Sequence, residues 1–196
     1  MDDIPLGNWR EETIEEQAAR ILREVTVSNE PKIQFEVRLE TSDSLRGEYK
    51  FFEEHFGTPT SIVYPCCGPD ITLREVFPSV PTKYIDKDER VVAKLTETGI
   101  DACCVDATTY AGEFDLLVIQ NPQLNANKLV HLVKTNGLIL ANNYHRTAAQ
   151  LFAQPNQFAF LGLIDDINKP TRLVNLDAAK LILAKYCDVQ SVFRKL

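Results

Sequence analysis

The sequence predicts an α/β domain with a doubly wound, mostly parallel sheet, helices on both faces and an antiparallel last strand. Three observations favour this fold. From Ser61 onward, short apolar runs alternate with helical patterns. The interiors of these runs are continuously apolar, as in strands that are buried on both faces. Glycine or polar residues follow the runs, at the edge where such sheets bind their ligands.

The composition is that of an ordinary acidic globular protein. The chain has 196 residues, of which 44% are hydrophobic, and a net charge of −7. This length suffices for one α/β domain with a core. The negative charge opposes nucleic-acid binding, no apolar run has the length of a membrane span, and the acidic N-terminus is unlike a signal peptide. We therefore expect a cytosolic protein with neither nucleic acid nor membrane as a partner.

The cysteines do not form the pattern of a secreted disulfide framework. There are five, an odd number, and four of them stand in the adjacent pairs Cys66–Cys67 and Cys103–Cys104. We expect reduced thiols and no metal site, because adjacent cysteines lack the gap with which a chain wraps one zinc ion. Cys103 and Cys104 are predicted as small buried residues of a strand.

Residues 1–58 are predicted as a helical extension or cap, and residues 59–196 as the Rossmann-like domain. Apolar positions predict an amphipathic helix over Glu11–Val25. Ile33–Leu39 alternates like a strand, although an irregular segment is also compatible with it. A second helix is predicted from Ser44 to His55, ending at Gly57. These segments either cover a site or shield the sheet.

The rest of the chain follows the alternation in order. Strands are predicted around Ile62–Val63, Lys83–Ile85, Ile100–Val105, Phe114–Ile119, Leu138–Ala141 and Phe158–Ile164, with an antiparallel edge strand at Val189–Phe193. Helices are predicted over Ile71–Phe77, Glu89–Thr98 after an Asp88 cap, Asn125–Lys134, His145–Phe152 and Leu176–Tyr186 after an Asn175 cap. Right-handed crossovers between such strands make the sheet largely parallel.

Candidate ligand-binding residues follow the predicted strands. A tight turn with Gly68 follows the first strand, and Asp86 follows the second, 18 positions after Gly68. A separation of roughly 20 residues is expected when a carboxylate binds the hydroxyls of a ribose. Asp86 and Asp106 have the alternative of capping helices or turns.

The order of these features resembles the class I S-adenosylmethionine-dependent methyltransferases over about Ser61–Leu151. The resemblance is carried by the Gly68 turn, Asp86, Asp106 and the segments FDLLVIQNP and NGLILANN. It implies S-adenosylmethionine as the cofactor. It also implies a role for each of several residues: Tyr64, Pro65, Cys66, Gly68 and Asp70 in the cofactor loop, Asp86 at the ribose, Asp106 with Ala107 beside the adenine, and Asn121 with Pro122 at the methyl acceptor.

The loop departs from the family pattern. Tyr64 replaces an acidic residue, Cys66 and Asp70 replace two glycines, and the aromatic residue that follows Asn-Pro-Pro in amine methyltransferases is missing. Asp70 is a compensating carboxylate for an amino group in this interpretation. A nicotinamide dehydrogenase would require Gly-x-Gly-x-x-Gly, which this loop fits less well.

The resemblance implies methyl transfer to N or O of a small molecule. Asn121 and Pro122 would orient the acceptor through their carbonyl groups, and His145 is the histidine placed to act as a base. A solvent-facing role for His145 is the alternative. Two other functions stay open: a structural or regulatory partner that has lost catalysis, and a redox protein that uses Cys66 and Cys67. The sequence does not indicate the oligomeric state.

Overall fold

A computed structural model describes residues 36–166, 171–183 and 185–196 of the chain. Within them, Val37–Leu196 form one unit by their contacts. The predicted helix Glu11–Val25 lies outside the described residues, and the described part of Ile33–Leu39 is not a strand. Glu40 instead forms an isolated parallel bridge with Asp70. The division of the chain at residue 58 stays a prediction.

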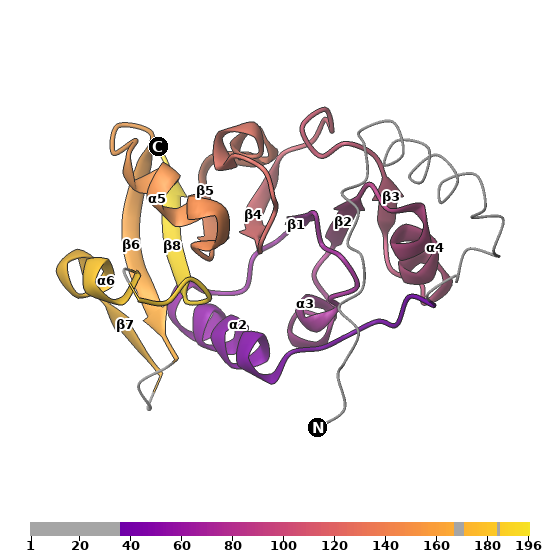
Figure 1. Ribbon diagram of the computed structural model, residues 1–196, viewed down its shortest axis with the longest axis horizontal. Coiled ribbons are helices and arrows are strands. Elements are labelled where there is room, and N and C mark those ends of the chain that lie inside the picture. The colour runs from indigo at the N-terminus through magenta and orange to yellow at the C-terminus, as the bar shows by residue number, and fades with distance from the viewer. Residues whose placement is uncertain (1–35, 167–170, 184) are drawn as a thin grey trace, which may run out of the picture. The chain divides into compact units, whose positions relative to one another are not determined.

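Eight strands form one mixed sheet in the order β3-β2-β1-β4-β5-β8-β6-β7 (Figure 1). Its first five strands are parallel: β1 (Ile62–Pro65), β2 (Thr82–Asp86), β3 (Ala102–Cys104), β4 (Phe114–Ile119) and β5 (Val133–Ala141). They confirm the predicted doubly wound, mostly parallel sheet. The strand order reverses between β1 and β4. These two strands are adjacent in the sheet, but β2 and β3 lie between them in the sequence.

The C-terminal half of the sheet corrects one prediction. β8 (Gln190–Lys195) is antiparallel to its neighbours, as expected, but it lies between β5 and β6 (Phe158–Asp165) and is not an edge strand. Its first four residues are buried, so both of its edges need partners. The edge is β7 (Arg172–Val174), which the sequence analysis did not predict.

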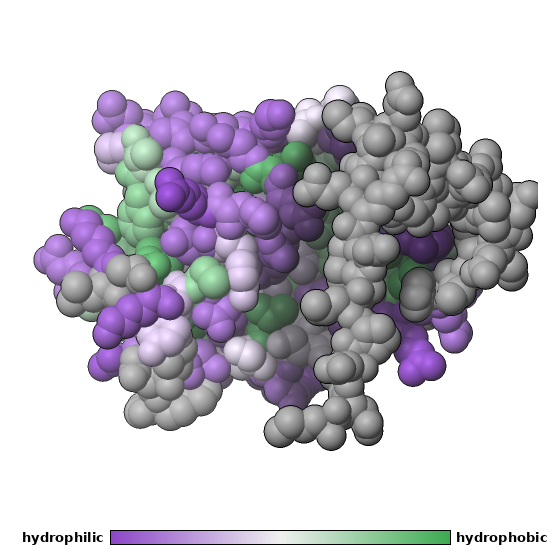
Figure 2. All heavy atoms as spheres, viewed as in Figure 1, coloured by the Kyte–Doolittle hydropathy of each residue, from purple (hydrophilic) through white to green (hydrophobic). Residues whose placement is uncertain are grey.

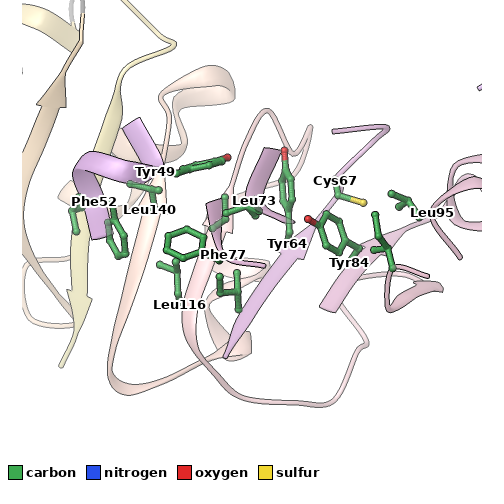
Figure 3. Packing of buried hydrophobic residues seen from close by; sticks show 14 of the residues in the cluster. Tyr49, Phe52, Tyr64, Cys67, Leu73, Phe77, Tyr84, Leu95, Leu116 and Leu140 are labelled. Carbon is green, nitrogen blue, oxygen red and sulfur yellow. The ribbon is translucent and has the colours of Figure 1, made fainter. Parts of the chain in front are cut away.

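Three helices cover one face of the sheet. They are α2 (Asp43–Phe56), α3 (Thr72–Val76) and α4 (Glu89–Glu97). Figure 3 shows Tyr49 and Phe52 of α2 in the same cluster as Leu116 of β4 and Leu140 of β5. All four side chains are fully buried.

The opposite face is covered by α5 (Thr147–Phe152) and by two 3-10 segments, η1 (Ala126–Lys128) and η2 (Val130–Leu132). The predicted helix Asn125–Lys134 is therefore wrong. Leu129 and Leu132 are fully buried through these tight turns, and β5 already begins at Val133. A further 3-10 segment, η3 (Tyr144–Arg146), precedes α5, and α6 (Leu176–Leu183) packs beside β6 and β7.

The continuous apolar runs are explained by burial on both faces. In β1, Ile62 and Tyr64 point to the cluster under α2 and α3, while Val63 points to the cluster under α5. β4 divides its residues between the two clusters in the same alternating way.

The predicted helix caps are present. Asp88 accepts a hydrogen bond from the Arg90 amide at the start of α4, and Asn175 accepts one from the Ala178 amide in α6. Gly57 ends α2 with φ of 84°, a conformation that glycine adopts without steric cost.

On the face shown in Figure 2, hydrophilic residues predominate among the described atoms, and hydrophobic ones form separate patches. Among the described helices, none is long and apolar enough to cross a bilayer.

Candidate functional site

A pocket of about 600 Å³ opens at the carboxyl ends of β1, β2 and β4. Parallel α/β sheets bind their ligands at this edge, where the strand order reverses. The described residues that line it include six of the predicted site residues: Tyr64, Cys66, Gly68, Asp86, Asn121 and Pro122. Predicted site residues from three strand ends, up to 58 positions apart in the sequence (Tyr64 and Pro122), thus meet in one cavity.

The turn after β1 forms one wall of this pocket. Cys66 and Gly68 both have left-handed backbone conformations, with φ of 54° and 55°. A left-handed conformation costs a residue with a side chain more than it costs glycine, so Cys66 is strained where the family has a glycine. A Cβ atom on Gly68 would meet no protein atom within 4 Å. The backbone at Gly68 is therefore open to a ligand.

Asp86 holds this turn from the end of β2. One carboxylate oxygen accepts a hydrogen bond from the Gly68 amide at 2.9 Å, and the other accepts one from the Asp88 amide at 2.9 Å. An ionised carboxylate has about four acceptor positions. Because the two amides occupy one position on each oxygen, Asp86 keeps acceptor capacity toward the pocket.

Asp106 lies at the same rim as Asp86 but does not line the pocket. Its carboxylate pairs with the Lys87 ammonium group at 2.8 Å and accepts hydrogen bonds from the amide and hydroxyl groups of Thr108. The Lys87 interaction and the Thr108 hydrogen bonds lower the Asp106 pKa to about 2. Lys87 itself lines the pocket, so it connects Asp86, its neighbour in the chain, with Asp106.

Four other predicted site residues lie outside the lining of the pocket. Pro65 and Ala107 are buried, and Ala107 belongs to the cluster under α5. Asp70 accepts a hydrogen bond from the Tyr64 hydroxyl at 3.0 Å and one from the Thr72 amide at 2.9 Å. These bonds turn Asp70 toward the start of α3. His145 is exposed in η3.

The segment after β4 forms the opposite wall. Asn121 and Gln123 have left-handed backbones, with φ of 44° and 50°, on either side of the buried Pro122. Asn121 is exposed, and its side-chain amide makes no hydrogen bond to another described residue. Strained backbone is concentrated at functional sites, and here it borders the pocket from two sides.

The sequence analysis assigned no cofactor or acceptor role to five described residues of the lining. They are Cys67, Lys87, Gln120, Gln123 and Leu124. Each lies within two positions of a predicted site residue, so position next to a strand end was the signal that would have found them. Gln120 is 8% exposed and takes part in a buried network of amides.

The two thiols at the pocket are not activated. Burial, and then the charge of Asp86, raise the pKa of Cys66 to about 11. The same causes raise the pKa of the buried Cys67 still further. Reactive cysteines have lowered pKa values, so this environment opposes the redox function.

The other pair of adjacent cysteines was predicted as buried, but Cys103 is half-buried and Cys104 is exposed. The described residues hold no cluster of side chains with the donors for a metal ion.

The fold is that of the class I S-adenosylmethionine-dependent methyltransferases. Among solved structures, the chain is similar to N-methyltransferase NodS from Bradyrhizobium japonicum WM9 in complex with S-adenosyl-L-homocysteine. The TM-score is 0.53 at 11% identity, over 90% of this chain and 97% of that one. No protein-family model matches the chain, and no curated protein matches it by sequence.

Two further structures share the fold. Plantazolicin methyltransferase BpumL, in complex with a pentazolic desmethylPZN analogue and S-adenosyl-L-homocysteine, has a TM-score of 0.51 at 13% identity, over 93% of this chain and 91% of that one. Ribosomal protein L11 methylase from Lactobacillus delbrueckii subsp. bulgaricus has a TM-score of 0.51 at 11% identity, over 76% of this chain and 77% of that one.

Proposed function

We propose that the protein is an S-adenosylmethionine-dependent methyltransferase and that the pocket at β1, β2 and β4 binds the cofactor. The observation that carries the proposal is the convergence of Gly68, Asp86 and Asn121 on one cavity at the reversal of strand order. The solved structures with this fold include several complexes with S-adenosyl-L-homocysteine.

The residues of the pocket fit a nucleoside cofactor. Its volume of about 600 Å³ lies within the range of roughly 300–1,000 Å³ for ligand sites. The open space at Gly68 admits a ligand close to the backbone, and Asp86 offers acceptor positions to two hydroxyl groups. Hydrogen bonds from hydroxyl groups to a carboxylate are stronger than those between neutral groups.

Methyl transfer depends more on positioning the acceptor against the methyl group than on acid or base catalysis. The bound cofactor would supply a methyl group on a sulfonium leaving group. We propose that Asn121 and Pro122 orient an acceptor at the mouth of the pocket through their carbonyl groups, and exclude water there. We also propose His145 as a base, although its side chain does not line the pocket.

We propose a small molecule, methylated at N or O, as the acceptor. The net charge of −7 supports an acceptor other than nucleic acid. A cytosolic location agrees with five cysteines that form no disulfide. Residues 1–58 are proposed as a cap of the domain formed by residues 59–196.

Calorimetric titration with S-adenosyl-L-homocysteine tests the proposal. We expect the wild type to bind, and Asp86→Ala to weaken binding about tenfold to hundredfold, since a hydrogen bond to a charged group contributes roughly 1.5–3 kcal/mol. Asp86→Asn keeps an oxygen that can accept the hydrogen bond from the Gly68 amide but removes the negative charge. It therefore distinguishes the effect of the charge on binding from the effect of the shape of the turn. Asp88→Ala, two residues away and outside the pocket, is the matched control and should bind normally.

A stability measurement with the ligand tests whether the protein still binds the cofactor, or is a structural or regulatory partner that has lost the site. A ligand that binds the folded state stabilises it, so S-adenosyl-L-homocysteine at 100 times its Kd should add about 2.7 kcal/mol to the free energy of unfolding. No stabilisation at saturating concentrations of either S-adenosylmethionine or its demethylated product would contradict the proposed function.

A further inference from the structure

A network of buried amides lies directly behind the wall of the pocket that follows β4. It consists of Gln120 after β4, Asn142 after β5 and Gln190 at the start of β8, which are 8%, 4% and 0% exposed. Ile119 pairs with Ala141, and Ala141 pairs with Ser191. Gln120, Asn142 and Gln190 are the chain neighbours of these paired residues, so the register of the sheet brings the three amides together at one edge.

The hydrogen bonds run in sequence through the three side chains. Gln190 and Gln120 form a reciprocal pair, in which each Nε2 donates to the Oε1 of the other at 3.1 and 2.7 Å. Asn142 Nδ2 donates to Gln120 Oε1 at 2.8 Å. Buried amides are costly unless they are paired, and these pair with one another.

Backbone groups at both ends allow only one orientation of all three amides. At one end, the Asp188 carbonyl can only accept, and Gln190 Nε2 donates to it at 3.1 Å. At the other end, Asn142 Oδ1 accepts from the backbone amides of Asn121 at 3.4 Å and Tyr144 at 3.3 Å, which can only donate. Turning any amide over would place two acceptors or two donors against each other.

The network ends on the strained segment of the pocket. The amide that Asn142 holds belongs to Asn121, which has φ of 44°, and Gln123 beyond Pro122 has φ of 50°. Such conformations persist only where the surrounding structure holds them. We infer that Asn142 and Gln190 are positioning residues, which hold residues 121–123 in the shape that the pocket requires. Gln190 acts through Gln120 and Asn142, without lining the pocket itself.

Amide hydrogen exchange measured by NMR tests this inference without any ligand. In Gln190→Met, we expect exchange at the Asn121 and Tyr144 amides to accelerate at least tenfold, although Gln190 bonds to neither. Val192→Ala is the matched control: Val192 is also fully buried in β8 but lies in the apolar cluster under α2. It should change these rates only as much as those of other core amides. If Gln190→Met fails to fold, Gln190→Asn keeps the amide and shortens its reach.

Affinity for S-adenosyl-L-homocysteine is the second measurement, and this part rests on the proposed function. Gln190→Met and Asn142→Leu should each weaken binding about tenfold, with Val192→Ala unchanged. Because the two residues act through one chain of hydrogen bonds, the double variant should lose little more than the worse single variant.

The outcomes separate the two ideas. If exchange at Asn121 in Gln190→Met matches that in Val192→Ala, or if the losses in affinity add fully in the double variant, the positioning role is overturned. If the wild type does not bind S-adenosyl-L-homocysteine, the proposed function fails. The exchange rates at Asn121 and Tyr144 still decide the positioning role in that case.

Discussion

At the scale of single residues, Cys66 shows how the pocket accommodates a departure from the family pattern. The methyltransferases that the sequence resembles have a glycine at this position, and Cys66 has a left-handed backbone, with φ of 54°, which favours glycine. Its side chain is half-buried in the pocket wall. With Cys66 in this position, the pocket still has a volume of about 600 Å³.

The pKa of Cys66 leads to a prediction about its reactivity. Burial disfavours the thiolate and raises the pKa to about 11, so the thiol is protonated at neutral pH. We expect iodoacetamide to alkylate Cys66 slowly at pH 7, and the rate to rise with pH until about 11. Mass spectrometry of the modified peptides checks this, with the exposed Cys104 as the internal reference. Rapid labelling of Cys66 at pH 7 would contradict the raised pKa and support the alternative that the protein has a redox function.

The ion pair between Lys87 and Asp106 gives a second prediction, for acid pH. The folded-state pKa of Asp106 is about 2, below its ordinary value of 3.8. Its contribution to stability is therefore present above pH 3.8 and is lost as the pH falls through about 2. An NMR titration of the Asp106 carboxyl carbon should show this midpoint, and Lys87→Met should raise it. Both side chains are partly exposed, so we expect the midpoint to shift in high salt as well.

At the scale of secondary structure elements, caps were predictable and packing-driven segments were not. Asp88 precedes an apolar helical pattern and so identified α4. A carboxylate at this position can accept hydrogen bonds from the free backbone amides of the first helical turn. The segment 125–134 also begins at a cap, because Asn125 accepts a hydrogen bond from the Asn127 amide, but a cap does not distinguish a 3-10 turn from an α-helix. It forms two 3-10 turns because Leu129 and Leu132 are drawn into the core on a short path to β5.

The cap of α4 gives a third prediction. Asp88→Ala removes the acceptor of the Arg90 amide, at 2.9 Å, and should lower the free energy of unfolding by about 1 kcal/mol. Urea denaturation checks this. Asp177→Ala, at an exposed acidic position in the first turn of α6, is the control, and its effect should stay within about 0.5 kcal/mol. Equal losses in both variants would mean that the cap contributes nothing specific.

At the scale of the whole molecule, the sheet separates two apolar layers that both reach the functional edge. Figure 3 shows Tyr64 and Tyr84 next to each other in the cluster under α2 and α3, and their ring centroids are 5.8 Å apart. Burial raises the pKa of both hydroxyls far above the usual range, so both tyrosines stay neutral. Two neutral aromatic side chains therefore lie at this edge, and Tyr64 is part of the pocket lining.

The layer under α2 gives a fourth prediction. Phe52 is fully buried between α2 and the sheet, so Phe52→Ala should cost about 3–5 kcal/mol of unfolding free energy. Phe51→Ala, at the adjacent and only half-buried position, should cost clearly less. Chemical denaturation measures both. If the two variants are equally stable, α2 is not an integral part of the domain.

Local patterns in the sequence determined the class of fold, most strand positions and the caps at Asp88 and Gly57, and the resemblance to the methyltransferases pointed to six residues of the pocket. They did so because burial on both faces, helix capping and the end of a strand each leave a signature within a few residues. Only the tertiary structure decided that β8 lies inside the sheet, that Asp70 turns toward α3 and that Gln190 meets Gln120. These outcomes depend on the register between segments up to 70 positions apart, and no short stretch of sequence contains that information.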